Sequence, residues 1–121
     1  MKVPQVYLRH ILDCIRRINE NTAGGMDRFM ASHTLQDAVL RNLQILAEST
    51  QRLSEDLKAK YPDADWQRIS AFRNVLVHNY LGIDMEIIWQ ITQHDVKQLN
   101  DVIERIFEGE NFNDQENVGS T

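Results

Sequence analysis

The sequence contains few of the residues that cross-link, bend or interrupt a chain. Its 121 residues include one cysteine, two prolines and five glycines, and aromatic residues make up only 7%. The single cysteine, Cys14, excludes an internal disulfide. The shortage of proline and glycine favours a mostly helical chain, because these two residues interrupt helices most strongly. Helical spacing of the apolar residues around Cys14 predicts that its side chain fills the core.

Long hydrophobic runs are also missing. Uninterrupted apolar stretches extend over only a few residues, whereas a transmembrane helix needs about 20. The first residues, MKVPQVYLRH, lack the apolar region of a signal peptide. We therefore expect a cytoplasmic protein with no membrane partner, and its length is appropriate for a single domain.

The chain has no excess of positive charge, since its formal net charge is -5 at pH 7. Four of its 18 acidic residues follow position 107, so residues 1–107 carry 14 acidic residues and all 13 basic ones. Such a nearly neutral body neither indicates nor excludes RNA as a partner. We assign residues 1–109 to one helical domain and expect the polar segment 110–121 to be a disordered tail.

Apolar residues recur at steps of three and four, which predicts amphipathic helices. The first runs from Val3 to Ile18 and ends at the loop NTAGG, residues 21–25. After a short turn or helix at 27–30, we expect Thr34 to cap the longest helix, which has about seven turns. The apolar stripe of this long helix consists of Leu35, Val39, Leu43, Leu46, Thr50, Leu53 and Leu57.

Helix-breaking residues interrupt the second half of the sequence. Pro62, in the segment YPDAD, ends the long helix, and Asp63 or Asp65 can cap the next one. That third helix carries an apolar series and continues to a stop marked by Gly82.

A fourth helix is expected to begin at the cap Asp84. The segment TQHD at 92–95 indicates a kink or a restart, followed by a last apolar series that ends at Gly109. No strand pattern and no internal repeat is visible in the sequence. The predicted fold class is therefore all-α, an up-and-down bundle of four to five helices.

The segment RNVLVHNY, residues 73–80, places polar side chains in a mostly apolar run. Burial without partners is costly, so these side chains either have partners inside the fold or line a cleft. On a straight helix Arg73 and Tyr80 lie on one face, whereas Asn74 and His78 lie together, with His78 about 140° from Arg73. Arg73 and His78 can therefore meet if the helix frays near His78, as Gly82 permits, or if two copies share the site around a two-fold axis, and we expect both.

The spacing of Arg73, His78 and Tyr80 is R-x4-H-x-Y, which resembles the signature of HepT-like toxins, a branch of the HEPN ribonuclease superfamily. The segments VYLRHILDCIRRI, QDAVLRNLQILAEST and DWQRISAFRNVLVHNY, with Asp84 and Trp89, are similar to that family in order and spacing. The chain departs from the family pattern I-G-E-A at LAES, although a small residue is kept at the second position. The resemblance implies an HEPN-like bundle that forms a homodimer with a shared cleft.

The resemblance also implies a metal-independent endoribonuclease that cleaves RNA, such as tRNA or mRNA. Histidine titrates near neutral pH, so His78 is expected to be a catalytic base or acid, and the two copies in a dimer can supply both. Arg73 stays protonated and is expected to hold the reacting phosphate, with Asn74 as a supporting group. We expect no cofactor and no bound metal, since the other histidines show no metal-ligand spacing.

Tyr80 has a separate role in this resemblance. HepT-like toxins are paired with a nucleotidyltransferase antitoxin of the MntA type, which transfers AMP from ATP to the motif tyrosine. This implies a type VII-like toxin–antitoxin system, in which the partner uses ATP and Mg²⁺ to convert Tyr80 to O-AMP-tyrosine. The added negative charge repels RNA from a phosphate-binding cleft and inactivates the toxin.

Two other interpretations stay open. The chain can be a catalytically silent HEPN module that binds nucleotide or docks on a nucleotidyltransferase, with Arg73 contacting phosphate. It can also be a helical adaptor in which Arg73 pairs with Glu48 or Asp84 and His78 is a satisfied interior histidine. Changing His78 then lowers stability, whereas the ribonuclease interpretation predicts a His78→Ala protein that folds and dimerises without toxicity.

Overall fold

Helices make up nearly all of the chain that this computed structural model describes, which comprises residues 4–78 and 82–110, with the backbone alone at 77 and 78. In chain order these are α1 (Pro4–Thr22), α2 (Met26–Met30), α3 (His33–Gln51), α4 (Glu55–Lys60), α5 (Trp66–His78), α6 (Met85–Gln90), the π-helical segment η1 (Ile91–Asp95) and α7 (Val96–Gly109). No strand occurs within these two ranges. The predicted all-α fold class is therefore confirmed.

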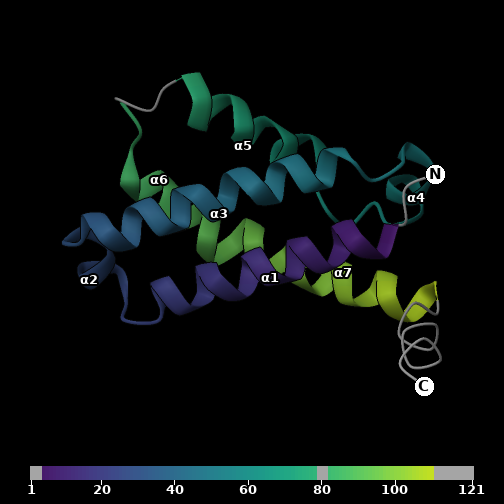
Figure 1. Ribbon diagram of the computed structural model, residues 1–121, viewed down its shortest axis with the longest axis horizontal. Coiled ribbons are helices and arrows are strands. Elements are labelled where there is room, and N and C mark those ends of the chain that lie inside the picture. The colour runs from purple at the N-terminus through teal and green to yellow at the C-terminus, as the bar shows by residue number, and fades with distance from the viewer. Residues whose placement is uncertain (1–3, 79–81, 111–121) are drawn as a thin grey trace.

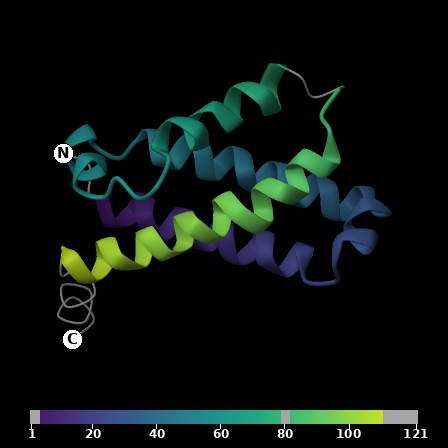
Figure 2. The same cartoon turned by 180° about the vertical axis from the view of Figure 1, so that it is seen from behind.

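Four long helical runs, α1, α3, α5 and the continuous α6–η1–α7, pass up and down the molecule (Figure 1). The helix α3 packs against α1 on one side and α5 on the other, and α7 packs against α1. Seen from behind, α6, η1 and α7 form one diagonal run (Figure 2). This is the expected up-and-down bundle, with α5 at its edge. Within the described residues, no helix combines the length and apolar character that a membrane span requires.

The core lies where α1, α3 and the run from α6 to α7 face one another. Its fully buried large side chains include Leu8, Ile11, Ile15, Ile18, Val39, Leu43, Leu46, Ile88, Leu99, Ile103 and Ile106. Burial of each such side chain contributes about 1.5–3 kcal/mol, so this contact dominates the stability of the bundle. Cys14 belongs to the same core, as predicted. Burial raises the pKa of its thiol to about 11, which keeps the group neutral at physiological pH.

The N-cap of α3 differs from the prediction. Ser32 occupies this position in extended conformation, and its Oγ accepts a hydrogen bond from the backbone N–H of Leu35 at 3.2 Å. The predicted cap, Thr34, already lies inside the helix. The two hydroxyl residues are equally suitable by type, and the position at which the chain enters α3 decides between them.

The predicted seven-turn helix is in fact two helices. The first, α3, ends at Gln51, and Ser54 then caps α4 by accepting a hydrogen bond from the N–H of Leu57 at 3.1 Å. Leu53 and Leu57 are nevertheless buried, so the apolar spacing continues across the break. This is why periodicity alone predicted one long helix.

Aspartate residues cap two helices after Pro62, as predicted. Asp65 caps α5 and Asp84 caps α6, each accepting a hydrogen bond from a backbone N–H in the first turn. The other candidate, Asp63, instead forms an ion pair at 2.9 Å with an arginine of α7. The described part of α5 extends to His78, and the predicted continuation to the stop at Gly82 runs through residues 79–81, which lie outside the described residues.

The irregularity predicted at TQHD is a π-helical segment inside an unbroken helical run. Ile91 and Val96 are both buried, although they are five residues apart. In a regular α-helix this step rotates a side chain by about 140°, off the core face. The wider π turn absorbs the extra residue and keeps both side chains inward. Thr92 lies within it, fully buried, and its hydroxyl donates to the Trp89 carbonyl at 2.7 Å.

Candidate functional site

The helix α5 carries the predicted site residues and packs into the core along one side only. Its apolar side consists of the buried residues Ile69, Phe72 and Leu76. Arg73, Asn74 and Val75 are exposed on the other side. Of the predicted site residues, Arg73 and Asn74 are therefore not enclosed by packing. Arg73 and Asn74 lie next to each other at the surface and need no interior partners.

Arg73 makes a loose ion pair across the edge between α3 and α5. Its Nε lies 3.7 Å from Oε1 of Glu48, and the two side chains are 46% and 44% exposed. This separation exceeds hydrogen-bond length, and exposed pairs of this kind contribute little to stability. Of the two acids that the sequence offered as partners, Glu48 makes the contact, while Asp84 caps α6.

The remaining motif residues are only partly described. His78 is the last residue of α5, and its side chain lies outside the described part of the structure, as does all of Tyr80. The spacing of Arg73 and His78 is five residues, a step that corresponds to a rotation of about 140° on a regular helix. Bringing Arg73, His78 and Tyr80 into one site therefore stays a prediction.

An apolar groove of about 350 Å³ runs between α5 and α6, directly beside the motif. Phe72, Val75, Leu76, Ile83, Ile87 and Ile88 line it, together with other residues of α5, of α3, of the segment before α6 and of η1. Val75 and Ile87, which both line this groove, are 44% and 56% exposed. This groove was not predicted from the sequence. The only signal was that α6, MEIIWQ, has apolar residues on more of its surface than one buried face can hold.

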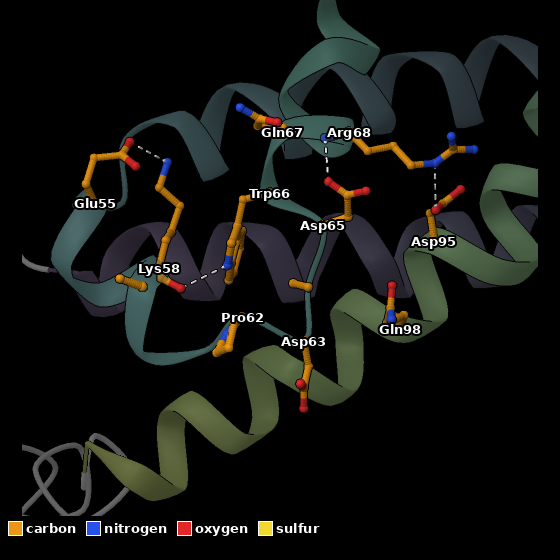
Figure 3. A pocket seen from close by; sticks show the side chains of 12 residues that line it. Glu55, Lys58, Pro62, Asp63, Asp65, Trp66, Gln67, Arg68, Asp95 and Gln98 are labelled. Atoms are coloured by element: carbon orange, nitrogen blue, oxygen red, sulfur yellow. Dashed lines mark hydrogen bonds and ion pairs between the residues drawn. The ribbon is translucent and has the colours of Figure 1, made fainter.

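A larger hollow of about 640 Å³ lies at the opposite end of α5, between α4, the turn at 62–65 and α7 (Figure 3). Several polar groups that line this hollow already form ion pairs or hydrogen bonds with other groups of the protein. Arg68 forms a 2.9 Å hydrogen-bonded ion pair with Asp95, which raises the pKa of Arg68, and Lys58 pairs with Glu55 at 3.2 Å. The indole N–H of Trp66 donates to two backbone carbonyls. We therefore regard this hollow as structural and place the candidate site at Arg73.

Metal-binding groups show no comparable clustering. Within residues 4–78 and 82–110, no group of three or more His, Cys, Asp or Glu side chains is arranged to hold a metal ion. The described part of the candidate site consists of Arg73, Asn74 and the neighbouring groove, while His78 and Tyr80 stay predicted site residues.

Comparison with known proteins places these residues in a family. The model of the family described as ribonuclease HepT-like matches residues 11–106. A protein of Methanocaldococcus jannaschii, provisionally named an RNase, is 36% identical over 110 residues, which is 88% of each chain. A protein of Thermococcus cleftensis, provisionally named ribonuclease HepT, is 29% identical over 101 residues, covering 83% of this chain and 92% of its own.

One relative is considerably longer than this chain. A second protein of M. jannaschii, named as a gamma-glutamylcyclotransferase and provisionally as an RNase, is 33% identical over 117 residues. The match covers 94% of this chain but only 53% of that protein, so the chain spans about half its length. No solved structure gives a significant match. Because the family model covers most of the chain, including the whole segment from Arg73 to Tyr80, the protein belongs to the HepT-like ribonuclease family.

Proposed function

We propose that this protein is a metal-independent endoribonuclease of the HEPN type and the toxin of a type VII-like toxin–antitoxin system. The observation that carries the proposal is the family match across the R-x4-H-x-Y segment, together with the exposure of Arg73 on α5. An exposed arginine is accessible to a phosphate without any rearrangement of the core.

RNA carries its own nucleophile, the 2′-hydroxyl, so the protein has to supply proton transfer and positive charge. In the proposed reaction His78 of one copy takes the 2′-hydroxyl proton while the oxygen attacks phosphorus. The bond from phosphorus to the 5′-oxygen breaks, and the protonated His78 of the second copy donates a proton to that oxygen. The products are a 2′,3′-cyclic phosphate and a 5′-hydroxyl. Arg73 stabilises the negative charge of the transition state, and Asn74 orients the phosphate.

A homodimer is part of this proposal. Two features support it, namely the divergence of Arg73 and His78 on one helix and the exposed apolar groove beside them. A second copy packing on Val75 and Ile87 around a two-fold axis covers that groove and brings two motifs to one cleft.

The dimer surface gives a direct prediction. Replacing Ile87 with aspartate is expected to raise the dimer dissociation constant by at least about tenfold, because an isoleucine contact is lost and a charge is placed in an apolar interface. Light scattering coupled to gel filtration measures the change, and cleavage per chain should fall in parallel at low protein concentration. Val6→Asp is the matched control, since Val6 is a similarly exposed apolar residue on α1. Equal dissociation constants for the two variants would contradict this surface.

We further propose that an MntA-type nucleotidyltransferase inactivates the protein by adenylylating Tyr80. The partner supplies ATP and Mg²⁺, the tyrosine oxygen attacks the α-phosphate, and pyrophosphate leaves. The attached AMP adds bulk and negative charge beside the phosphate-binding residues, which opposes RNA binding.

One experiment in two steps tests this function. The purified chain is first incubated with RNA in excess EDTA, where we expect cleavage to cyclic-phosphate ends. It is then treated with the nucleotidyltransferase, ATP and Mg²⁺, and examined by intact mass and peptide mapping. We expect an AMP-sized addition on Tyr80 and loss of cleavage, whereas Tyr80→Phe should stay active. Cleavage that requires a divalent ion would overturn metal independence. Absence of cleavage, with a tight complex between the two proteins, would instead support a silent docking module.

A further inference from the structure

Two side-chain contacts, one helical turn apart, join α3 to α5. Gln51 Nε2 donates to Ser70 Oγ at 2.9 Å, and Glu48 Oε1 lies 3.7 Å from Arg73 Nε. Glu48 and Gln51 are three residues apart on α3, as are Ser70 and Arg73 on α5, so both pairs lie on the same edge of two antiparallel helices. The position of Glu48 opposite Arg73 is therefore a consequence of helix packing and not of one flexible surface contact.

Glu48 is itself held in place from its own helix. Its neighbours Leu46 and Ala47 are fully buried, which fixes the orientation of this part of α3. The Gln44 amide donates to Glu48 Oε1 at 3.4 Å, so the oxygen that faces Arg73 is also the one held from the preceding turn. The carboxylate can therefore restrain the arginine side chain.

We propose that Glu48 is a positioning residue for Arg73, holding the guanidinium at the α3–α5 edge until an RNA phosphate displaces it. This inference rests on the proposed function. A carboxylate and a phosphate are the same kind of acceptor for a guanidinium, so they compete for it. The Arg73–Glu48 contact is long and half-exposed, which makes it weak enough to exchange. A shorter, buried pair would block the site permanently.

Replacing Glu48 is expected to change KM and kcat differently. In Glu48→Gln the amide keeps the size of the side chain but removes the competing charge. We expect KM for RNA to fall by about two- to fivefold, since exposed pairs of this kind contribute up to that factor. We expect kcat to stay close to the wild-type value, because the phosphate has already displaced Glu48 from Arg73 when it reacts. A residue that only supports the fold would not lower KM while leaving kcat unchanged.

The test measures cleavage kinetics and, separately, binding of a 2′-O-methyl RNA, which binds but lacks the attacking hydroxyl. Glu108→Gln in the last turn of α7 removes the same charge far from the end of α5 (Figure 1), and Gln51→Ala breaks the neighbouring contact without changing charge. Both controls should bind and cleave like the wild type. Glu48→Asp keeps the charge and should retain the wild-type KM. In an Arg73→Gln background, Glu48→Gln should no longer tighten binding.

The outcomes are distinguishable. If the wild type cleaves RNA and Glu48→Gln behaves like Glu108→Gln, Glu48 has no positioning role and the inference is overturned. If Glu48→Gln also tightens binding in the Arg73→Gln background, its effect does not act through Arg73, and the inference is equally wrong. If the wild type neither cleaves nor binds RNA, the proposed function itself fails and this inference fails with it. Thermal unfolding of each variant identifies any that misfold, and Glu48→Ala, which also removes the charge, then serves in place of Glu48→Gln.

Discussion

Replacing Arg73 with alanine is expected to lower RNA cleavage by about 10²–10³-fold, the loss typical of removing one group that stabilises transition-state charge. The residue is half-exposed and its one described ion pair is loose, so the fold should be unchanged. Single-turnover cleavage under saturating protein measures the effect on the chemical step. Arg73→Lys should recover only part of the rate, because an ammonium keeps the charge but cannot hold a phosphate bidentately.

Arg105→Ala is the matched control for this prediction. Arg105 lies on α7, its side chain is 51% exposed, and it also forms one ion pair, with Asp63 at 2.9 Å. Its removal changes net charge by the same amount, so a general weakening of RNA attraction would affect both variants alike. If the two variants lost activity equally, Arg73 would have no specific role. If Arg73→Ala unfolded the protein, the adaptor interpretation would replace the catalytic one.

Replacing Phe29 with alanine is expected to destabilise the protein by about 3–5 kcal/mol, the usual cost of truncating a fully buried phenylalanine. Phe29 is 0% exposed, and its ring lies 5.5 Å from that of Trp89, centroid to centroid. It attaches the short helix α2 to α6 and to the core, although α2 has only five residues. Domains of this size are stable by only about 5–15 kcal/mol, so this substitution removes a large part of the free energy of unfolding.

Unfolding in urea checks this second prediction, with the midpoint expected to fall and the slope to stay similar. Met30→Ala is the control, since Met30 is the next residue of α2 and is 37% exposed. Phe29→Leu keeps most of the apolar volume and should be destabilised far less than Phe29→Ala. A Phe29→Ala protein as stable as Met30→Ala would mean that α2 does not contribute to the core.

The helices and several of their boundaries could be predicted from local chemistry. Amphipathic spacing identified α1 and α7, and the carboxylate caps Asp65 and Asp84 act as their residue type predicts. The break between α3 and α4 was missed because Leu53 and Leu57 continue the apolar spacing through it. Apolar spacing indicates which residues are buried. Two successive helices can bury the same residues as one long helix, so the spacing does not locate the break between them.

Sequence alone determined the fold class, the family resemblance and the candidate residues Arg73, Asn74, His78 and Tyr80. It also limited Arg73 to an acidic partner or a ligand without choosing between Glu48 and Asp84. Only the tertiary structure decided that Glu48 faces Arg73 and that α5 and α6 leave an apolar groove beside the motif. Periodicity assigns a side chain to a face of its own helix, whereas its neighbour across the bundle depends on how the helices pack.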